Sequence, residues 1–232
     1  MSIGKDPGAP VALYEILQAA GEPELIDREV PPGAALLELG CGAGRITHPL
    51  VALGRQVVAV DFDADMLAHV RGAETVLSRI EDLRLGRTFG GVVLMSNLVN
   101  TRDDAQRAAL LASCQRHVEP GGVVLIERYD PNSGIDTTPT ETRRFGLTIR
   151  VTDIRREGPL LFWTIEYDAG DRGTWSFRLE GARVLSDDET VAALAAAGLR
   201  LERWLDERRR WLAASPRIRE DARRIREREE LA

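Results

Sequence analysis

A glycine-rich segment at residues 38–44, Glu-Leu-Gly-Cys-Gly-Ala-Gly, places small residues at a spacing that suits the binding of a ligand by the main chain. Residues without large side chains let the backbone approach a ligand closely. A helix that begins at Gly44 would point its free N–H groups and the positive end of its dipole at that ligand. Residues 34–39 have the composition of a buried strand. The segment therefore predicts a ligand-binding turn between a strand and a helix, although glycine spacing alone is also typical of ordinary turns.

Asp61 supports this interpretation because it ends the next apolar segment, residues 56–60, about twenty positions after Gly40. Doubly wound α/β folds place a carboxylate there against the hydroxyl groups of a ribose. The pattern differs from the dinucleotide fingerprint G-x-G-x-x-G, since the third glycine comes one position early and Arg45 occupies its place. The sequence also lacks a P-loop, G-x-x-x-x-G-K-[S/T]. These features predict a nucleoside-containing ligand other than a nicotinamide dinucleotide.

Segments of strand and helix composition alternate over residues 34–129, which is typical of a parallel sheet with helices on both faces. Residues 10–33 are expected to form an N-terminal helical cap, with a helix at 10–20 that ends before Gly21. Any ligand should bind at the carboxyl ends of the strands. The core strands are expected at 34–39, 56–61, 74–78, 91–95 and 123–127, with helices after the glycine turn and at 63–70 and 103–117.

The sequence changes in character after Tyr129. Residues 130–142 are rich in Pro, Gly, Ser and Thr and predict a long loop, a kind of segment that often covers a functional site. Residues 143–180 predict an antiparallel β insertion, because turn residues separate three alternating or aromatic-rich segments. These segments are 144–154, 160–167 and 173–179.

Residues 186–214 are expected to close the fold with a helix that Ser186 caps and with strands at 199–205 and 210–213. Residues 215–232 begin with Ser-Pro, a typical helix start, and predict a charged C-terminal helix. We expect residues 1–232 to form a single domain.

Composition excludes several classes of protein. The net charge of −6 argues against a dedicated nucleic-acid binder. No apolar stretch approaches the roughly 18 residues of a membrane-spanning helix. Two cysteines cannot form a disulfide scaffold, so we expect a reducing cytoplasmic location. Three scattered histidines and two separated cysteines predict no metal site. Cys41 is interpreted as a small turn residue, since no His or Asn partner for a nucleophile is recognisable.

In these motifs and in their order, the sequence resembles the class I S-adenosylmethionine-dependent methyltransferases, and among them bacterial small-molecule methyltransferases of natural-product biosynthesis. The resemblance covers residues 34–128. It implies an α/β fold with a Rossmann-like seven-stranded sheet, helices on both faces and the last strand antiparallel, with the β insertion after strand five. The segments that carry it are 38–44, Asp61-Phe62-Asp63 with Met66, 81–83, 92–97 and 118–122.

The resemblance implies S-adenosyl-L-methionine as cofactor and S-adenosyl-L-homocysteine as product. Glu38 would reach the amino group of the methionine part, Asp61 would accept both ribose hydroxyls, and Phe62 and Met66 would flank the adenine. The sequence departs from the family at Arg79-Ile80, where an acidic residue often precedes the apolar one, so adenine recognition could involve Glu81 or Asp82. The implied cofactor-binding residues are Glu38, Gly40, Cys41, Gly42, Gly44, Asp61, Phe62, Met66, Ile80, Glu81, Asp82 and Ser96.

The methyl acceptor is expected beyond the carboxyl ends of strands four and five. Because the cofactor carries the reactive group, the protein mainly has to orient the acceptor and exclude water, and no catalytic triad is required. Asn97 and Tyr14 are the candidate catalytic residues. Asn97 and Asn100 could instead cap the following loop, and Arg128 could be a solvated arginine. The candidate substrate-binding residues are Tyr14, Asn97, Asn100, Arg128 and Tyr129.

The expected reaction is O- or N-methylation of a small molecule of secondary metabolism. Residues 96–100 lack the Asn/Asp-Pro-Pro-aromatic run of enzymes that methylate base amines, which again disfavours nucleic acid. Two alternatives stay open: a cofactor-binding protein of this fold that catalyses a non-methylating step such as a cyclisation, and a non-catalytic binding subunit. A homodimer through the β insertion or the C-terminal helix is a further expectation.

Overall fold

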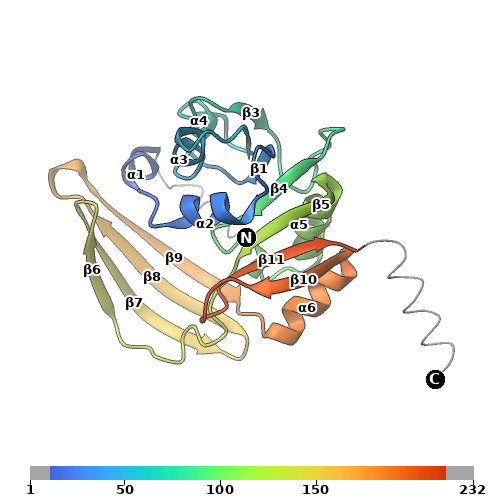
Figure 1. Ribbon diagram of the computed structural model, residues 1–232. Helices are drawn as coiled ribbons and strands as arrows, with labels where there is room; N and C mark the ends of the chain where they lie inside the picture. Colours follow the sequence, from blue (N-terminus) through green and yellow to red (C-terminus); the bar gives the residue numbers. More distant parts are fainter. Residues whose placement is uncertain (1–10, 218–232) are drawn as a thin grey trace, which may run out of the picture.

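A seven-stranded, mainly parallel sheet forms the centre of the molecule in the computed structural model, which describes residues 11–217 (Figure 1). The strand order is β10-β11-β5-β4-β1-β2-β3. β1 pairs in parallel with both β2 and β4, whereas β11 is antiparallel to β5 and β10. The strands are β1 Leu36–Leu39, β2 Val57–Asp61, β3 Glu74–Leu77, β4 Phe89–Leu94, β5 Val118–Glu127, β10 Leu199–Trp204 and β11 Trp211–Pro216. The predicted seven-stranded sheet with a reversed last strand is confirmed.

The chain order reverses between β1 and β4, because β2 and β3 extend the sheet on one side of β1 and β4 and β5 extend it on the other. Open α/β sheets bind ligands in the crevice at the carboxyl ends of the strands where the order reverses. The glycine turn follows β1 directly at this point. The topology therefore positions residues 40–44 at the expected binding crevice.

Helices cover both faces of this sheet. Alternate side chains of the strands face opposite layers: Leu37, Val92 and Val124 pack with α5, while Leu36, Val93 and Leu125 pack with α2 and α3. Strands that are buried on both faces read as nearly continuous apolar runs, as observed in β4 and, apart from the buried Glu38, in β1. The helices are α1 Val11–Ile16, α2 Glu22–Glu29, α3 Thr47–Ala52, α4 Ala64–Leu67, α5 Asp104–His117 and α6 Asp187–Ala196, with short 3-10 helices at Leu98–Asn100 and Gly170–Arg172.

The N-terminal cap differs from the single helix expected at 10–20. Its first helix, α1, ends at Ile16, and a second helix, α2, starts after Gly21, which has a left-handed φ of 100°. Pro23 lies in the first turn of α2, where its missing N–H group costs nothing. The cap is therefore two short helices joined by a bend, and not one longer helix.

The β insertion is a separate antiparallel sheet in the order β6-β7-β8-β9 (lower left in Figure 1). Its strands are β6 Thr140–Arg144, β7 Leu147–Glu157, β8 Leu160–Asp168 and β9 Thr174–Arg183. Three strands were expected, and the additional strand is β6. All five residues of β6 are exposed, so this edge strand shows no apolar alternation that would have revealed it. Leu147 and Ile149 pack against Ile16 and Leu17 beside α1, which joins the insertion to the N-terminal cap.

The closing segment agrees with its predicted helix start. The Ser186 hydroxyl accepts a hydrogen bond from the Glu189 N–H, and the Glu189 carboxylate accepts one from the Ser186 N–H, which forms the expected capping box. The prediction that Ser215 and Pro216 start a helix is wrong, because both residues end β11. The rest of the expected C-terminal helix lies outside the described residues. Within residues 11–217, no helix is both long and apolar enough to cross a membrane.

Candidate functional site

The glycine turn is held in a conformation that other residues rarely adopt. Gly40, Gly42 and Gly44 have φ values of 82°, 55° and 92°. A Cβ atom at Gly40 would lie 3.0 Å from Leu98 Cδ1, and one at Gly44 would lie 2.7 Å from the His48 ring. The chain runs through residues 42–46 as a turn before α3 begins at Thr47, so the regular helix starts later than expected. Both backbone shape and close packing therefore require glycine here.

Asp61 fastens this turn to the end of β2. One carboxylate oxygen accepts a hydrogen bond from the Gly42 N–H at 2.8 Å, and the other accepts one from the Asp63 N–H at 3.0 Å. The carboxylate is buried. It therefore lies beside the glycine turn, where the sequence placed a ribose-binding acid.

The residues expected around adenine have different surroundings. Phe62 leaves 48% of its surface exposed, whereas Met66 is buried, so of these two only Phe62 presents a face to a ligand. Ile80 is partly buried, and its Cδ1 lies 3.8 Å from the position of a Cβ at Gly40. Glu81 accepts a hydrogen bond from Gln106, and Asp82 is exposed.

Glu38 is a buried carboxyl group inside the turn. It leaves only 3% of its surface exposed and accepts a hydrogen bond from the Thr47 hydroxyl at 2.6 Å. Burial, followed by the negative charge of Asp61, raises the pKa of Glu38 from 4.5 to about 7, against the opposing effects of Thr47 and Arg45. A cation that enters the crevice would favour its ionised form.

We expect the affinity for S-adenosylmethionine to increase with pH up to about 7, as Glu38 loses its proton, and then to level off. The affinity rises with pH because, below its raised pKa, Glu38 of the free protein holds a proton that the bound ammonium group displaces. In that range the affinity should change by up to about tenfold per pH unit. Isothermal titration calorimetry across this range measures the effect. In the Glu38→Gln variant the slope should vanish. An equal slope in both proteins would contradict a titrating Glu38.

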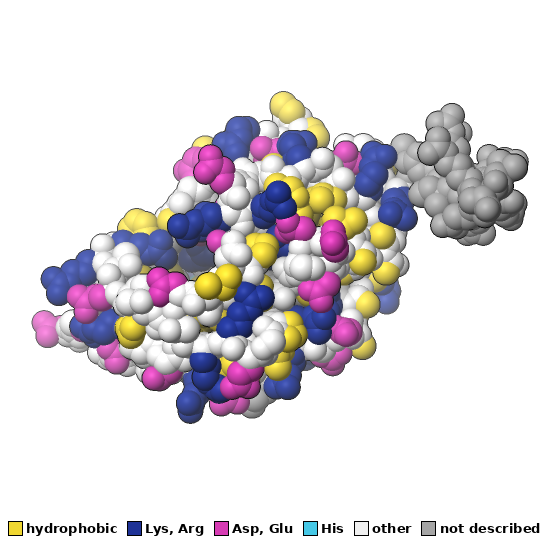
Figure 2. Space-filling view, turned by 90° about the horizontal axis from the view of Figure 1, so that it is seen from below, with side chains coloured by type: hydrophobic (Ala, Val, Ile, Leu, Met, Phe, Trp, Pro, Cys, Tyr) yellow, Lys and Arg dark blue, Asp and Glu magenta, His cyan; other side chains and the backbone are white. Residues whose placement is uncertain are grey.

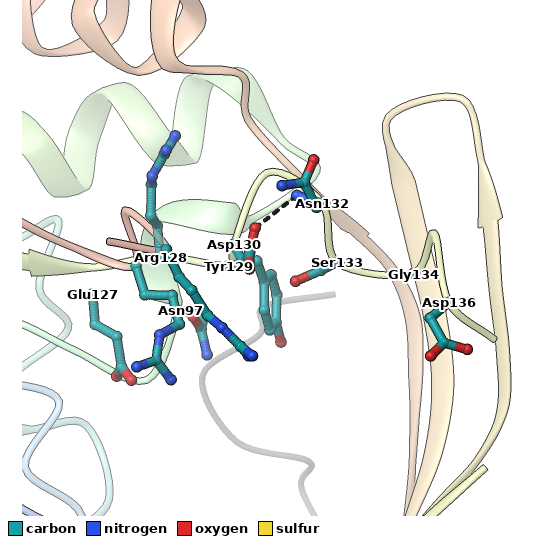
Figure 3. Close-up of a pocket in the computed structure, with 11 residues that line it drawn as sticks. Asn97, Glu127, Arg128, Tyr129, Asp130, Asn132, Ser133, Gly134 and Asp136 are labelled. Atoms are coloured by element: carbon teal, nitrogen blue, oxygen red, sulfur yellow. Dashed lines mark hydrogen bonds between the residues drawn. The ribbon is translucent and has the colours of Figure 1, made fainter. Parts of the chain in front are cut away.

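A cavity of about 380 Å³ opens beyond the carboxyl ends of β4 and β5, where the acceptor was expected (Figure 3). The loop after β5 forms one wall, and the hairpin between β10 and β11 contributes two arginines. The lining residues are Asn97, Glu127, Arg128, Tyr129, Asp130, Asn132, Ser133, Gly134, Asp136, Arg208 and Arg210.

The end of β4 has an unusual backbone. Ser96 and Asn97 both adopt the left-handed region, with φ values of 55° and 56°. For residues other than glycine this conformation costs on the order of 1–3 kcal/mol each, and such strain concentrates at active sites. The turn directs the Ser96 N–H to the Glu127 carboxylate, at 2.8 Å. Ser96 itself is exposed and Asn97 half-buried.

Tyr129 connects the cavity to the β insertion. Its ring meets Trp163 of β8 edge to face, with the ring centroids 5.0 Å apart. Aromatic pairs in this geometry stabilise a contact by about 0.5–1.5 kcal/mol beyond simple burial. One of the insertion's aromatic residues therefore supports the cavity wall.

Two of the predicted acceptor residues have side chains that bond to other parts of the protein. Asn100 is fully buried, and its amide donates to the Arg183 carbonyl at 2.7 Å and accepts from the Tyr129 N–H at 2.9 Å. The Arg128 guanidinium is also completely buried and forms an ion pair with Asp187. Both polar groups join loops together, and of the two only Arg128 lines the cavity.

Tyr14 lies in a different place from the one expected. Its ring is 3.5 Å from where a Cβ of Gly42 would lie, and it lines a second cavity of about 540 Å³ together with Gly44 and His48. This cavity lies between the N-terminal cap and the glycine turn. Tyr14 therefore flanks the turn. The cavity beyond β4 and β5 brings together three of the predicted acceptor residues, Asn97, Arg128 and Tyr129.

The two cysteines and His48 lie in environments that indicate structural roles. Burial raises the pKa of the Cys114 thiol to about 12 and also raises that of Cys41, so both thiols stay protonated. His48 accepts a hydrogen bond from the Arg71 N–H at 3.0 Å. The described part of the chain brings together no three His, Cys, Asp or Glu residues in a metal-binding group.

Glu127 is one of several cavity residues that sequence analysis did not select, together with Arg208 and Arg210. It is the last residue of β5 and lines the cavity. The available signal was its position, since an acid that ends a core strand had already singled out Asp61 at the end of β2.

Comparison with known proteins gives a consistent result. A family model described as a methyltransferase domain matches residues 36–122. The dTDP-3-amino-3,4,6-trideoxy-alpha-D-glucopyranose N,N-dimethyltransferase of Streptomyces venezuelae is 30% identical over 203 residues, 80% of this chain and 83% of that protein. The dTDP-3-amino-3,6-dideoxy-alpha-D-glucopyranose N,N-dimethyltransferase of Streptomyces fradiae is 30% identical over 198 residues, 80% of this chain and 77% of that protein.

Among solved structures, that of Streptomyces venezuelae DesVI is similar, with a TM-score of 0.67 and 27% identity over 90% of this chain and 93% of that one. The likeness covers 90% of the chain and therefore extends well beyond the cofactor-binding core. Together with the glycine turn and Asp61, it shows that the chain belongs to the class I S-adenosylmethionine-dependent methyltransferases that act on small molecules.

Proposed function

We propose that the chain methylates the amino group of an amino sugar carried on a nucleoside diphosphate, in bacterial natural-product biosynthesis. The observation that carries this proposal is the likeness, over 80% of the chain, to two enzymes named for N,N-dimethylation of dTDP-bound 3-amino sugars. Likeness of this extent includes the acceptor side of the fold as well as the cofactor side. It favours nitrogen over oxygen as the methylated atom.

The residues at the crevice fit S-adenosylmethionine. The buried Glu38 carboxyl group, whose hydrogen-bond donor is the neutral Thr47 hydroxyl, suits the ammonium group of the methionine part. Asp61 suits the ribose hydroxyls, and the half-exposed Phe62 offers a flat apolar face to adenine. The bound cofactor supplies an electrophilic methyl group, and these residues orient it.

The cavity beyond β4 and β5 suits a charged sugar nucleotide. Its volume of about 380 Å³ is within the range of about 300–1,000 Å³ that small-ligand sites span. Arg208 and Arg210 offer positive charge to phosphates, and Glu127 offers negative charge to an amine. Asn97, in its left-handed turn at the cavity wall, would orient the acceptor nitrogen.

Turnover of defined acceptors tests the proposal. The protein is incubated with methyl-labelled S-adenosylmethionine and with dTDP-3-amino-3,6-dideoxy-alpha-D-glucopyranose or its counterpart with a 3-hydroxyl group, and products are identified by mass spectrometry. We expect mono- and dimethylated amine and no methyl ether. Methylation of the hydroxyl compound alone would overturn the assignment to nitrogen.

The same assay separates the alternatives from methyl transfer. A cyclase of this fold would change an acceptor's mass without adding the label, and a non-catalytic subunit would bind cofactor and transfer nothing. Formation of S-adenosylhomocysteine in step with labelled product would exclude both.

We also propose self-association through the β6–β9 sheet, whose aromatic residues, among them Trp175 and Phe177, are only half-buried. Multi-angle light scattering at several concentrations gives the molar mass in solution. A constant monomer mass would overturn this proposal and leave the catalytic one unaffected.

A further inference from the structure

Glu127 lies at the point where the acceptor cavity meets the end of β4. Figure 3 shows it with Asn97 and Arg128 at one end of the cavity, while Asp136 lies at the other end. Its Oε2 atom accepts the hydrogen bond from the Ser96 N–H, which leaves Oε1 for a further partner. Among the described residues, Glu127 has no ion-pair partner within 4 Å.

The backbone at Ser96 and Asn97 is shaped for this contact. Two successive left-handed residues other than glycine persist only where the surrounding structure favours them. Their effect here is to turn one N–H group toward a carboxylate at the end of the neighbouring strand. The strain therefore serves to fix the position of the Glu127 carboxylate at the mouth of the crevice.

We propose that Glu127 binds the amino group of the acceptor as an ammonium ion and accepts its proton before methyl transfer. The inference rests on the proposed N-methylation. In this role Glu127 is a catalytic residue on the acceptor side, separate from the glycine turn and Asp61, which are assigned to the cofactor.

The charges around Glu127 support this role. Burial raises the pKa of its carboxyl group, and the negative charge of Glu22 on α2 raises it further. The Ser96 N–H, Arg45 beside the glycine turn and Arg210 of β11's hairpin act in the opposite direction. Tyr129, two residues after Glu127, remains a neutral phenol, because burial and the charge of Glu127 raise the pKa of Tyr129. A desolvated carboxylate with a raised pKa is a stronger proton acceptor than an exposed one.

The step balances as a proton transfer. The acceptor R–NH₃⁺ gives one proton to the carboxylate, leaving R–NH₂ and a neutral Glu127 carboxylic acid. The freed lone pair forms the N–C bond as the C–S bond breaks and its electrons pass to sulfur, so the product is a methylammonium ion. Glu127 returns its proton to solvent, and a second round requires the same sequence of events.

Glu127→Gln tests the inference, because glutamine can still accept the Ser96 hydrogen bond but cannot take a proton. We expect kcat to fall by about 10²–10⁴-fold, the usual contribution of a general base. The matched control is Glu119→Gln, which removes a carboxylate from the opposite end of the same strand and should retain wild-type kcat.

The pH profile separates proton transfer from a structural role. The variant must use acceptor that is already neutral, so its kcat/KM should rise by up to about tenfold per pH unit below the pKa of the amine. The kcat/KM of the wild type should change less with pH. The ratio of wild-type to variant kcat/KM should therefore decrease as the pH rises. A ratio that stays constant with pH would overturn the role as base.

Binding provides a second readout that needs no turnover. In the presence of S-adenosylhomocysteine, calorimetry compares dTDP-3-amino-3,6-dideoxy-alpha-D-glucopyranose with its 3-hydroxyl counterpart. The wild type should prefer the amine by roughly tenfold to a hundredfold, as for a hydrogen bond between charged groups, and Glu127→Gln should lose that preference. A preference that persists, or an equal loss of affinity for S-adenosylhomocysteine, would overturn the inference. Failure of the wild type to methylate the bound amine would instead overturn the proposed function.

Discussion

Replacement of Arg128 with alanine is expected to lower the free energy of unfolding by about 3–5 kcal/mol, as is usual when one partner of a buried ion pair is removed. The guanidinium is fully buried and donates to the Arg209 carbonyl at 2.8 Å and to the Thr190 hydroxyl at 2.6 Å. It also pairs with Asp187 and lies 4.3 Å over the Trp204 ring. Without it, these acceptors lose their partner inside the protein.

Arg209→Ala is the matched control, because Arg209 pairs with the same Asp187 carboxylate but leaves 51% of its side chain exposed. Removal of an exposed partner usually costs no more than about 1 kcal/mol. Urea unfolding followed by circular dichroism measures both variants. Similar losses of unfolding free energy in the two variants would show that burial does not determine how much Arg128 contributes to stability.

The features that could be predicted from the sequence share a local signal. The glycine turn combines small residues with a preceding apolar strand, and Asp61 stands at the end of the next one. The parallel order of the core follows from the same alternation of strand and helix, so the position of the binding crevice could be predicted as well.

Arg128 and Asn100 show why the acceptor side could not be predicted as well. The partners of Arg128 lie at residues 185–190 and at Arg209, and Asn100 donates to the carbonyl of Arg183. No local pattern indicates that a polar side chain at a strand end meets a segment so much later in the chain. β6 was missed for a different reason, since a strand exposed on both faces has no apolar alternation.

Replacement of Asp61 with alanine is expected to reduce the affinity for S-adenosylmethionine by at least about a hundredfold. Two hydrogen bonds from ribose hydroxyls to a carboxylate contribute about 1.5–3 kcal/mol each, and 1.4 kcal/mol corresponds to a factor of ten. The substitution also removes the acceptor of the Gly42 N–H, so the glycine turn loses one of its attachments to β2. Calorimetric titration with the cofactor measures the change, and circular dichroism checks the fold.

Asp61→Asn separates the Gly42 contact from the ribose contact. An asparagine oxygen can still accept from the Gly42 N–H, while its amide nitrogen can accept neither from a ribose hydroxyl nor from the Asp63 N–H. We expect this variant to fold with a melting temperature lowered only by the loss of the Asp63 hydrogen bond, and to lose about tenfold or more in affinity for the cofactor, which is one charge-assisted hydrogen bond. Asp65→Ala, an exposed acid on α4, controls for the loss of negative charge near the crevice and should bind normally. Wild-type affinity in Asp61→Asn would mean that Asp61 shapes the turn and does not contact the ribose. Equal weakening in Asp61→Asn and Asp65→Ala would mean that the overall charge, and not the two hydroxyl contacts, determines binding.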